Sequence, residues 1–191
     1  VTPAEGPVGT KVTVAGTDAS AGGLVEVYWE NLASSPLNST YALGSGAFEL
    51  KVNIPEAVGG THYLIVKDGA TTVAKTFNIT AEISLSALSG IPGDSVTVNG
   101  TGFSGTAPAR NVTVTFSNGT YTSTVAAINA SSTGAFSVNF VVPAVDYGDY
   151  TVTATDQNTT AITDDEAFTV GAAISRSPTS GPTGEVVTIT G

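Results

Sequence analysis

The sequence has few of the residues on which catalytic and metal sites are usually built. Its 191 residues include no cysteine, no methionine and a single histidine, and six basic side chains stand against sixteen acidic ones. The absence of cysteine excludes disulfide bonds and thiolate metal sites, so stability must come from apolar cores. The net charge of −10 opposes binding to nucleic-acid phosphates and anionic lipids. We therefore expect no nucleic-acid partner.

Long apolar runs are also missing. Hydrophobic residues make up 41% of the chain and charged residues 12%, which is typical of a folded globular protein. The apolar residues occur in short runs, far below the roughly 18 consecutive residues that a membrane helix requires. We expect no direct membrane insertion in this segment.

The chain contains an internal repeat. A stretch that begins at Gly6 returns at Gly90 and again at Gly181, giving periods of 84 residues (90 − 6) and 91 residues (181 − 90). The three copies read GPVGTKVTVAGT, GIPGDSVTVNGT and GPTGEVVTITG. Repeats of this length indicate tandem units. The predicted limits are 1–81 for repeat one, with its first strand incomplete, 82–172 for repeat two, and 173–191 for the first strands of a third repeat.

Two interpretations of the C-terminal stub remain open. Because the chain opens inside one strand pattern and stops inside another, it is expected to be an excerpt from a longer array. The alternative is that the stub completes a sandwich in a neighbouring molecule by donating a strand.

Alternating apolar and polar residues predict strands throughout, and no window shows a helical stripe. Expected inward rows include Val12 and Val14 in repeat one and their counterparts Val96 and Val98 in repeat two. Asn118-Gly119 is a hairpin turn signal. About seven strands per repeat is the size of an immunoglobulin-like sandwich, and we expect Tyr63 and Tyr150 to be core residues at a tyrosine corner, with their hydroxyls bound to nearby backbone. The predicted fold class is all-β, as tandem immunoglobulin-like β-sandwich domains.

A family resemblance rests on the opening motif of each repeat. The pattern Pro-x-x-Gly-Pro-x-Gly-x-x-Val-Thr-Val-x-Gly-Thr resembles the start of the IPT/TIG-like immunoglobulin-like repeats of microbial surface proteins. It runs from Pro3 to Thr17, from Pro178 to Gly191 and less completely from Ala87 to Thr101. Gly102-Phe103 continues the pattern, whereas Asp18-Ala19 departs from it. The resemblance implies an extracellular stalk, adhesin or filament role.

Glycosylation sequons form the sharpest chemical signal. Seven of the ten asparagines begin Asn-x-Ser/Thr, although only about two or three would do so by chance. The sequon asparagines are Asn38, Asn78, Asn99, Asn111, Asn118, Asn129 and Asn158. None of them needs to be buried, as a solvated glycan requires. We expect covalent N-glycans, and the density of sequons is associated with archaea rather than bacteria.

The sequence offers few residues that could carry out catalysis. His62 is expected to alternate outward as a solvated residue beside Tyr63, and no matching histidine occurs in repeat two. Neither a Ser/His/Asp arrangement nor a recurring pair of carboxylates is present. We expect no enzymatic activity, no catalytic residue and no cofactor.

Two weaker candidate sites remain. The acidic run of Asp164, Asp165 and Glu166 offers oxygen ligands for Ca²⁺, but it lacks EF-hand spacing and is expected to be a solvated loop. Tyr28, on the outward face beside the inward Trp29, is a candidate contact for a glycan or a protein. The loops 31–41 and 104–110 also depart from the repeat pattern.

These observations favour a structural function. We expect a tandem-repeat segment of an N-glycosylated extracellular filament, stalk or surface-layer protein, S-layer or pilus-like, whose partners are adjacent repeats of the same or identical chains. Short junctions such as residues 79–83 predict little bending between repeats. The alternative is an adhesin or a carbohydrate-binding module of the same fold.

Overall fold

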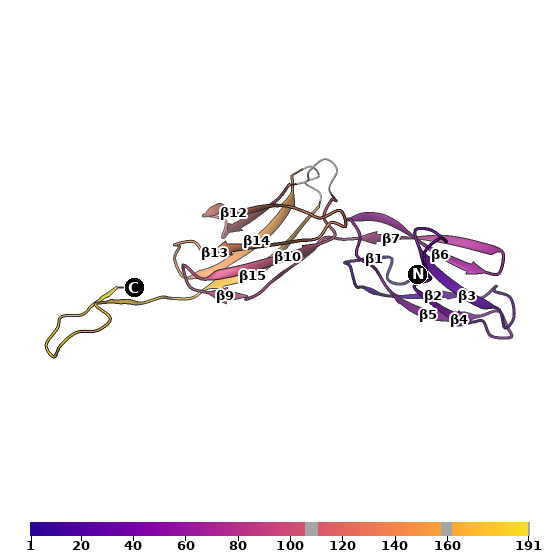
Figure 1. Ribbon diagram of the computed structural model, residues 1–191, viewed down its shortest axis with the longest axis horizontal. Helices are drawn as coiled ribbons and strands as arrows, with labels where there is room; N and C mark the ends of the chain where they lie inside the picture. Colours follow the sequence, from indigo (N-terminus) through magenta and orange to yellow (C-terminus); the bar gives the residue numbers. More distant parts are fainter. Residues whose placement is uncertain (106–110, 158–161, 191) are drawn as a thin grey trace.

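The computed structural model shows two β-sandwiches joined end to end, followed by a short C-terminal hairpin (Figure 1). It describes residues 1–105, 111–157 and 162–190. This described part contains strands and turns only, so it includes no helix with the length and apolar character needed to cross a bilayer. The predicted all-β fold class is confirmed.

Repeat one is a sandwich of a five-stranded and a two-stranded sheet. The larger sheet has the order β1-β7-β6-β3-β4, and the smaller one pairs β2 with β5. The strands are β1 (Glu5–Gly6), β2 (Lys11–Gly16), β3 (Leu24–Trp29), β4 (Asn38–Tyr41), β5 (Phe48–Asn53), β6 (Gly60–Asp68) and β7 (Thr71–Ile79). β1 lies parallel to β7, and the other pairings are antiparallel.

Repeat two has the same arrangement with one additional strand. Its five-stranded sheet has the order β12-β11-β14-β15-β9, and its second sheet has the order β13-β10-β8. The strands are β8 (Glu82–Leu85), β9 (Ser89–Gly90), β10 (Ser95–Thr101), β11 (Asn111–Ser117), β12 (Thr122–Asn129), β13 (Phe136–Val141), β14 (Gly148–Asp156) and β15 (Thr163–Val170). The hairpin that follows consists of β16 (Ser175–Ser177) and β17 (Thr188–Thr190).

Each sandwich encloses its own core, and the period-2 alternation places most of the inward rows correctly. Val96, Val98, Val112, Val114, Phe116, Val152 and Ala154 are at most 1% exposed, as are Val12, Val25 and Val27 in repeat one. The Asn118-Gly119 turn also forms, because the Asn118 amide donates to the Tyr121 carbonyl at 3.0 Å. Burial of these aliphatic and aromatic side chains is the main stabilising contribution to each unit.

The predicted tyrosine corner is confirmed in repeat two and wrong in repeat one. Tyr150 is 4% exposed, and its hydroxyl donates to the carbonyl of Asp146 at 3.0 Å. Tyr63 is 48% exposed. β6 begins at Gly60, whose counterpart at the start of β14 is Gly148, and alternation from that point turns His62 and Leu64 inward, leaving Tyr63 on the outer face.

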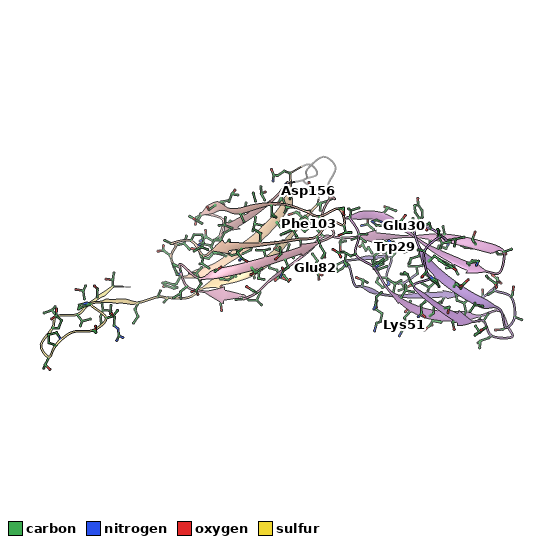
Figure 2. All side chains as sticks on the ribbon, in the orientation of Figure 1. Trp29, Glu30, Lys51, Glu82, Phe103 and Asp156 are labelled. Atoms are coloured by element: carbon green, nitrogen blue, oxygen red, sulfur yellow. The ribbon has the colours of Figure 1, made fainter. Side chains whose placement is uncertain are left out.

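The two sandwiches contact each other directly through their loops. The Gly59 amide donates to the Phe103 carbonyl at 3.2 Å, and the Thr133 hydroxyl donates to the Glu56 carboxylate at 2.9 Å. A side chain on Gly59 would collide with the carbonyl oxygen of Gly102. Figure 2 shows Phe103 and Glu82 close to this junction. Close backbone approach therefore holds repeat one against repeat two.

Candidate functional sites

The sequon asparagines lie mainly on the outer faces and edges of the two sandwiches. Asn38, Asn99, Asn118 and Asn129 are exposed. Asn99 lies on β10 between the buried Val98 and Gly100 and so projects outward from the smaller sheet. A glycan on such a side chain extends into solvent without disturbing the core.

Two sequon side chains already have hydrogen-bond roles. The Asn118 carboxamide oxygen accepts from the amides of Thr120 and Tyr121 at 3.1 and 2.8 Å, which closes the turn between β11 and β12. The Asn38 amide nitrogen donates to the Lys51 carbonyl at 2.8 Å, linking β4 to β5 across the sandwich edge. Glycosylation requires one N–H of the carboxamide, so the second N–H of Asn38 stays available for the backbone bond.

The remaining sequons differ in accessibility. Asn78 is half-buried in β7, where it lies between Glu5 of β1 and Thr61 of β6. Asn111 begins β11, and its side chain lies outside the described residues. Asn158 also lies outside them. All seven positions stay predictions as glycosylation sites.

The acidic run forms part of strand β15 rather than a solvated loop. Alternation sends Asp164 and Glu166 to one face and the exposed Asp165 to the other. Asp164 accepts a hydrogen bond from the amide of Ile83 at 2.8 Å and so binds the first residues of β8. In the described part of the chain, no three His, Asp or Glu side chains come together as a metal site would require. Asp164 therefore has a structural role.

The expectation for His62 is wrong, because its side chain is only 12% exposed. The imidazole stacks on Trp29, with ring centroids 5.0 Å apart and planes inclined by 21°. Its Nδ1 lies 2.7 Å from the Glu30 carboxylate, and its Nε2 lies 2.8 Å from the Val58 carbonyl. Both neighbours are acceptors, so both contacts are hydrogen bonds only when the ring carries two protons.

Glu30 is held in an unusual backbone conformation beside this histidine. Its φ of 62° lies in the left-handed region, which a residue with a Cβ adopts at a cost of about 1 kcal/mol. The same carboxylate accepts from the backbone amide of Tyr63 at 3.2 Å, and the Glu30 amide donates to the Tyr63 carbonyl at 2.9 Å. These contacts with β6 offset the backbone strain.

Tyr28 is not the exposed contact residue that its position on the outward face predicted. It is 6% exposed, and the Lys67 ammonium lies over its ring at 5.9 Å from the centroid. Lys67 also donates to the Glu26 carboxylate at 3.2 Å. The hydrogen bond to Glu26, together with the charge of that carboxylate, raises the pKa of Lys67 above its ordinary value of 10.5.

A recurring carboxylate was missed by sequence reasoning. Asp68 at the end of β6 accepts from the amide of Ser20 at 2.6 Å, and Asp156 at the end of β14 accepts from the amide of Ser104 at 3.1 Å. Asp156 is fully buried. The two aspartates are 88 residues apart, the same offset as Phe48 and Phe136, and that coincidence is the signal that could have found them.

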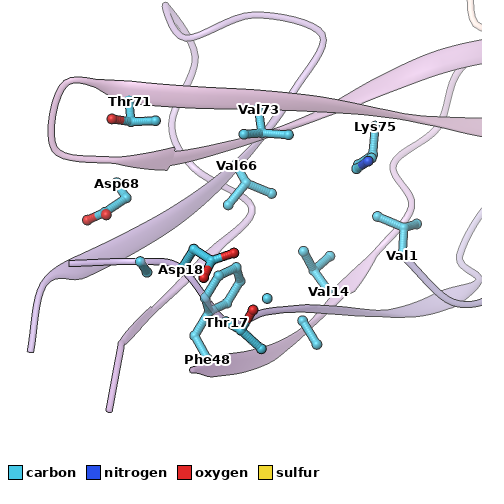
Figure 3. Close-up of a pocket in the computed structure, with 13 residues that line it drawn as sticks. Val1, Val14, Thr17, Asp18, Phe48, Val66, Asp68, Thr71, Val73 and Lys75 are labelled. Atoms are coloured by element: carbon cyan, nitrogen blue, oxygen red, sulfur yellow. The ribbon is translucent and has the colours of Figure 1, made fainter. Parts of the chain in front are cut away.

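A cavity of about 360 Å³ opens at the side of repeat one, between β2 and β7. Figure 3 shows Val14, Phe48 and Val66 on its apolar walls and Val73 at its rim. Val73 is 50% exposed. Ala19 also lines this cavity, at the position that the bulky Phe103 holds in the repeat alignment. No sequence pattern had indicated this cavity.

Comparisons with known proteins find similarity to solved structures only. No family model and no curated protein matches this sequence. A tetra-tandem repeat from the extending region of a large adhesion protein matches with a TM-score of 0.40 and 22% identity, covering 84% of this chain and 45% of that one. The D0-D1 domain of intimin matches at 0.36 and 14%, covering 88% and 95%.

A third solved structure, the Yersinia pseudotuberculosis adhesin InvE, matches at a TM-score of 0.35 with 13% identity over 90% of this chain and 57% of that one. The present chain thus spans about half the length of the first and third of these structures. Similarity at this level does not assign the chain to a family, and the fold rests on the sheet topology described above.

Proposed function

We propose that this chain is a structural, non-catalytic tandem-repeat segment of an N-glycosylated extracellular filament, stalk or surface-layer protein. The observation that carries the proposal is the direct contact between the two sandwiches, in which the backbone of Gly59 meets that of Phe103. Only three residues lie between the end of one core, at Ile79, and the start of the next, at Ile83, and both isoleucines are 2% exposed. A junction this short transmits orientation from one unit to the next.

The sequons and the charge are consistent with this role. Exposed asparagines on both sandwiches would carry hydrophilic glycans that cover sheet edges and hinder proteases. The net charge of −10 keeps the surface soluble and limits non-specific association.

Small-angle X-ray scattering and negative-stain electron microscopy of the 191-residue chain test this proposal. A rod with one narrowly distributed angle between the two sandwiches is expected. The junction variant Gly59→Leu, which forces the backbones apart, should broaden that distribution, whereas Gly69→Ala at an exposed hairpin should not. A wide range of angles in the wild-type chain would contradict the proposal.

A second candidate function is adhesion through an apolar patch on repeat one. Leu24 and Tyr41 are paired across β3 and β4 and are 41% and 71% exposed, and Leu43 beside them is 65% exposed. Exposed tyrosines and leucines in one patch suit contact with a protein or with the face of a sugar ring. Glycan-array and cell-binding assays with Tyr41→Ser against Tyr147→Ser, at an exposed tyrosine elsewhere, would test it.

A further inference from the structure

The loop between β5 and β6 carries contacts of repeat one with repeat two. It covers residues 54–59, and we call it the junction loop. Its Gly59 amide donates to the Phe103 carbonyl at 3.2 Å. The Val58 side chain lies against Gly105, where an added Cβ would come within 2.7 Å of a Val58 methyl carbon. The position of this loop therefore helps to set how the two sandwiches meet.

His62 holds the junction loop from the side of repeat one. Nε2 of its ring lies 2.8 Å from the carbonyl oxygen of Val58, the residue before Gly59. The carbonyl of Val58 and the amide of Gly59 belong to the same peptide unit. Because a peptide unit is planar, a change in the direction of its C=O also turns its N–H. His62 and Phe103 thus bind opposite ends of one peptide group.

The His62 ring has little freedom to adjust its position. It stacks on Trp29 with centroids 5.0 Å apart, and the side chain is only 12% exposed. Its Nδ1 lies 2.7 Å from the Glu30 carboxylate, which also accepts from the Tyr63 amide. Figure 2 shows Trp29 and Glu30 in the half of repeat one nearer to repeat two. A change in the charge of the ring therefore alters its two polar contacts rather than its place.

The two contacts respond differently to the loss of a proton. The charged ring has two N–H groups and donates to both acceptors, whereas the neutral ring has one N–H and one lone pair. A hydrogen bond to a charged acceptor is about twice as strong as one to a neutral acceptor, so the remaining proton stays on Nδ1, facing Glu30. Nε2 then presents a lone pair to the Val58 carbonyl oxygen, and this contact with the junction loop is lost.

We propose that His62 makes the junction between the two sandwiches sensitive to pH, so that it is tight when the imidazole is protonated and looser when the ring is neutral. The inference rests on the proposed structural function and adds a means of regulating it. The contribution of the ring to the junction is present in acid and is lost as the pH rises and Nε2 gives up its proton. Histidine ordinarily changes charge between about pH 5 and pH 8.

The charged group that contacts the ring, among the residues that the structure describes, is Glu30. Trp29 of β3 and Phe77, which lies opposite His62 on β7, present no charge to it. In the junction loop, the Glu56 carboxylate accepts from the Thr133 hydroxyl of repeat two. Carboxylates ordinarily titrate at lower pH than imidazole does. As the pH rises from 5, the imidazole is therefore the group in this cluster that changes charge.

Repeat two has a tyrosine at the equivalent position. The Tyr150 hydroxyl donates to the Asp146 carbonyl at 3.0 Å, in the loop that corresponds to the junction loop. Tyrosine hydroxyls ordinarily keep their proton up to about pH 10. The contact in repeat two is therefore a donor that does not respond to pH near neutrality, and it supplies the design of a control variant.

Nitrogen-15 NMR of the 191-residue chain tests the protonation step, because His62 is the only histidine. The ring is expected to carry protons on both nitrogens at pH 5 and on Nδ1 alone at pH 8. A neutral ring with its proton on Nε2 would keep the Val58 contact and would overturn the proposal. A ring whose charge is the same at pH 5 and pH 8 would overturn it as well.

Amide hydrogen exchange tests the transfer of this change to the junction loop. The protection factor of the Gly59 amide, which corrects for the intrinsic dependence of exchange on pH, should fall by about threefold or more between pH 5 and pH 8. Gly93 is the matched control, since its amide donates to the Val142 carbonyl at 3.0 Å within repeat two. Equal changes at Gly59 and Gly93 would contradict a local effect of His62.

Small-angle X-ray scattering at pH 5 and pH 8 tests the effect on the angle between the sandwiches. The distribution for the wild type should widen at pH 8 but stay narrower than that of Gly59→Leu, because the Glu56–Thr133 contact remains. His62→Tyr, which supplies a permanent donor, should stay narrow at both pH values. His62→Phe keeps the stacked ring without a donor and should be as wide at pH 5 as the wild type is at pH 8.

The outcomes separate this proposal from the structural function on which it rests. A wild-type distribution that is equally narrow at pH 5 and pH 8 would refute the role of His62 and leave the structural function standing. A distribution that is wide at both pH values would contradict the structural function itself. A response of His62→Tyr as large as that of the wild type would show that another group senses the pH, and the proposal would fail.

Discussion

His62 of repeat one occupies the position of Tyr150 in repeat two and makes the same contact with the backbone. Tyr150 donates to the carbonyl four residues earlier, at Asp146, and Nε2 of His62 lies 2.8 Å from the carbonyl of Val58, also four residues earlier. The aromatic stacking is reproduced as well. Tyr150 stacks on Phe116 with centroids 4.6 Å apart, much as His62 stacks on Trp29. The histidine therefore replaces the corner tyrosine.

This equivalence predicts that His62 stabilises repeat one and leaves the stability of repeat two unchanged. His62→Ala removes the stacked ring and both polar contacts, so we expect the free energy of unfolding of repeat one to fall by about 2–4 kcal/mol. Tyr150→Phe removes only a hydroxyl and should cost repeat two about 1–2 kcal/mol. Differential scanning calorimetry would measure both as shifts of separate transitions. The expectation fails if His62→Ala leaves the unfolding of repeat one unchanged.

The ion pair of Lys67 and Glu26 predicts a dependence of stability on alkaline pH. The pKa of Lys67 is raised in the folded state, first by its hydrogen bond to Glu26 and then by the charge of that carboxylate. A raised lysine pKa contributes stability that is complete below the ordinary value of 10.5 and is lost as pH rises through the folded value. The melting temperatures of wild type and Glu26→Gln should therefore differ at pH 7 and converge above the folded-state pKa of Lys67.

Salt provides the control for this prediction. The Lys67 side chain is 35% exposed, so the difference between wild type and Glu26→Gln should shrink in 1 M salt, where the screening length falls to about 3 Å. Lys51→Gln, at an exposed lysine outside any ion pair that the structure shows, should alter neither the pH dependence nor the salt dependence. A difference that survives both treatments would point to packing rather than charge.

The sequence was sufficient for the fold class and for most inward-facing rows, because alternation in β2, β10, β11 and β14 is regular and each strand has one buried face. Sequence reasoning placed Tyr63 in the core because tyrosine suits a core better than histidine does. The glycine that begins each strand instead determines which of the following residues alternate inward. Tyr28 was placed on the correct face of β3, but the Lys67 ammonium lies over its ring, and long cationic side chains shield apolar surface in ways that alternation does not show.

The acidic run illustrates a different limit. Asp164 looked like part of a charged loop because three acids in succession suggest solvent exposure. Its carboxylate instead receives the amide of Ile83, a contact between residues 81 positions apart. Contacts of this range are set by topology.

Ala19 and Phe103 occupy equivalent positions in repeats one and two, and we expect substitutions at these two positions to have opposite effects on stability. Phe103 is fully buried and packs edge to face on Phe136 with centroids 5.1 Å apart, so Phe103→Ala should lower the stability of repeat two by about 3–5 kcal/mol. Ala19→Phe places a ring in the cavity of repeat one and should stabilise it by about 0.5–2 kcal/mol. Chemical denaturation followed at Trp29, the only tryptophan, reports on repeat one. Destabilisation by Ala19→Phe would show that the cavity cannot take a ring.

The environments of the sequons predict unequal glycan occupancy. Asn99 and Asn129 are exposed on strands whose neighbours face inward, so both should be modified, and Asn78, half-buried between β1 and β6, should be the least occupied of the sites whose side chains are described. Glycopeptide mass spectrometry of native material would rank them. Thr101→Val removes the hydroxyl that the Asn99 sequon requires and keeps the side-chain shape, so the glycan mass at Asn99 should vanish while occupancy at Asn129 stays the same. Full occupancy at Asn78 would show that modification precedes folding, because a transferase acting on the folded sandwich must reach the carboxamide from solvent.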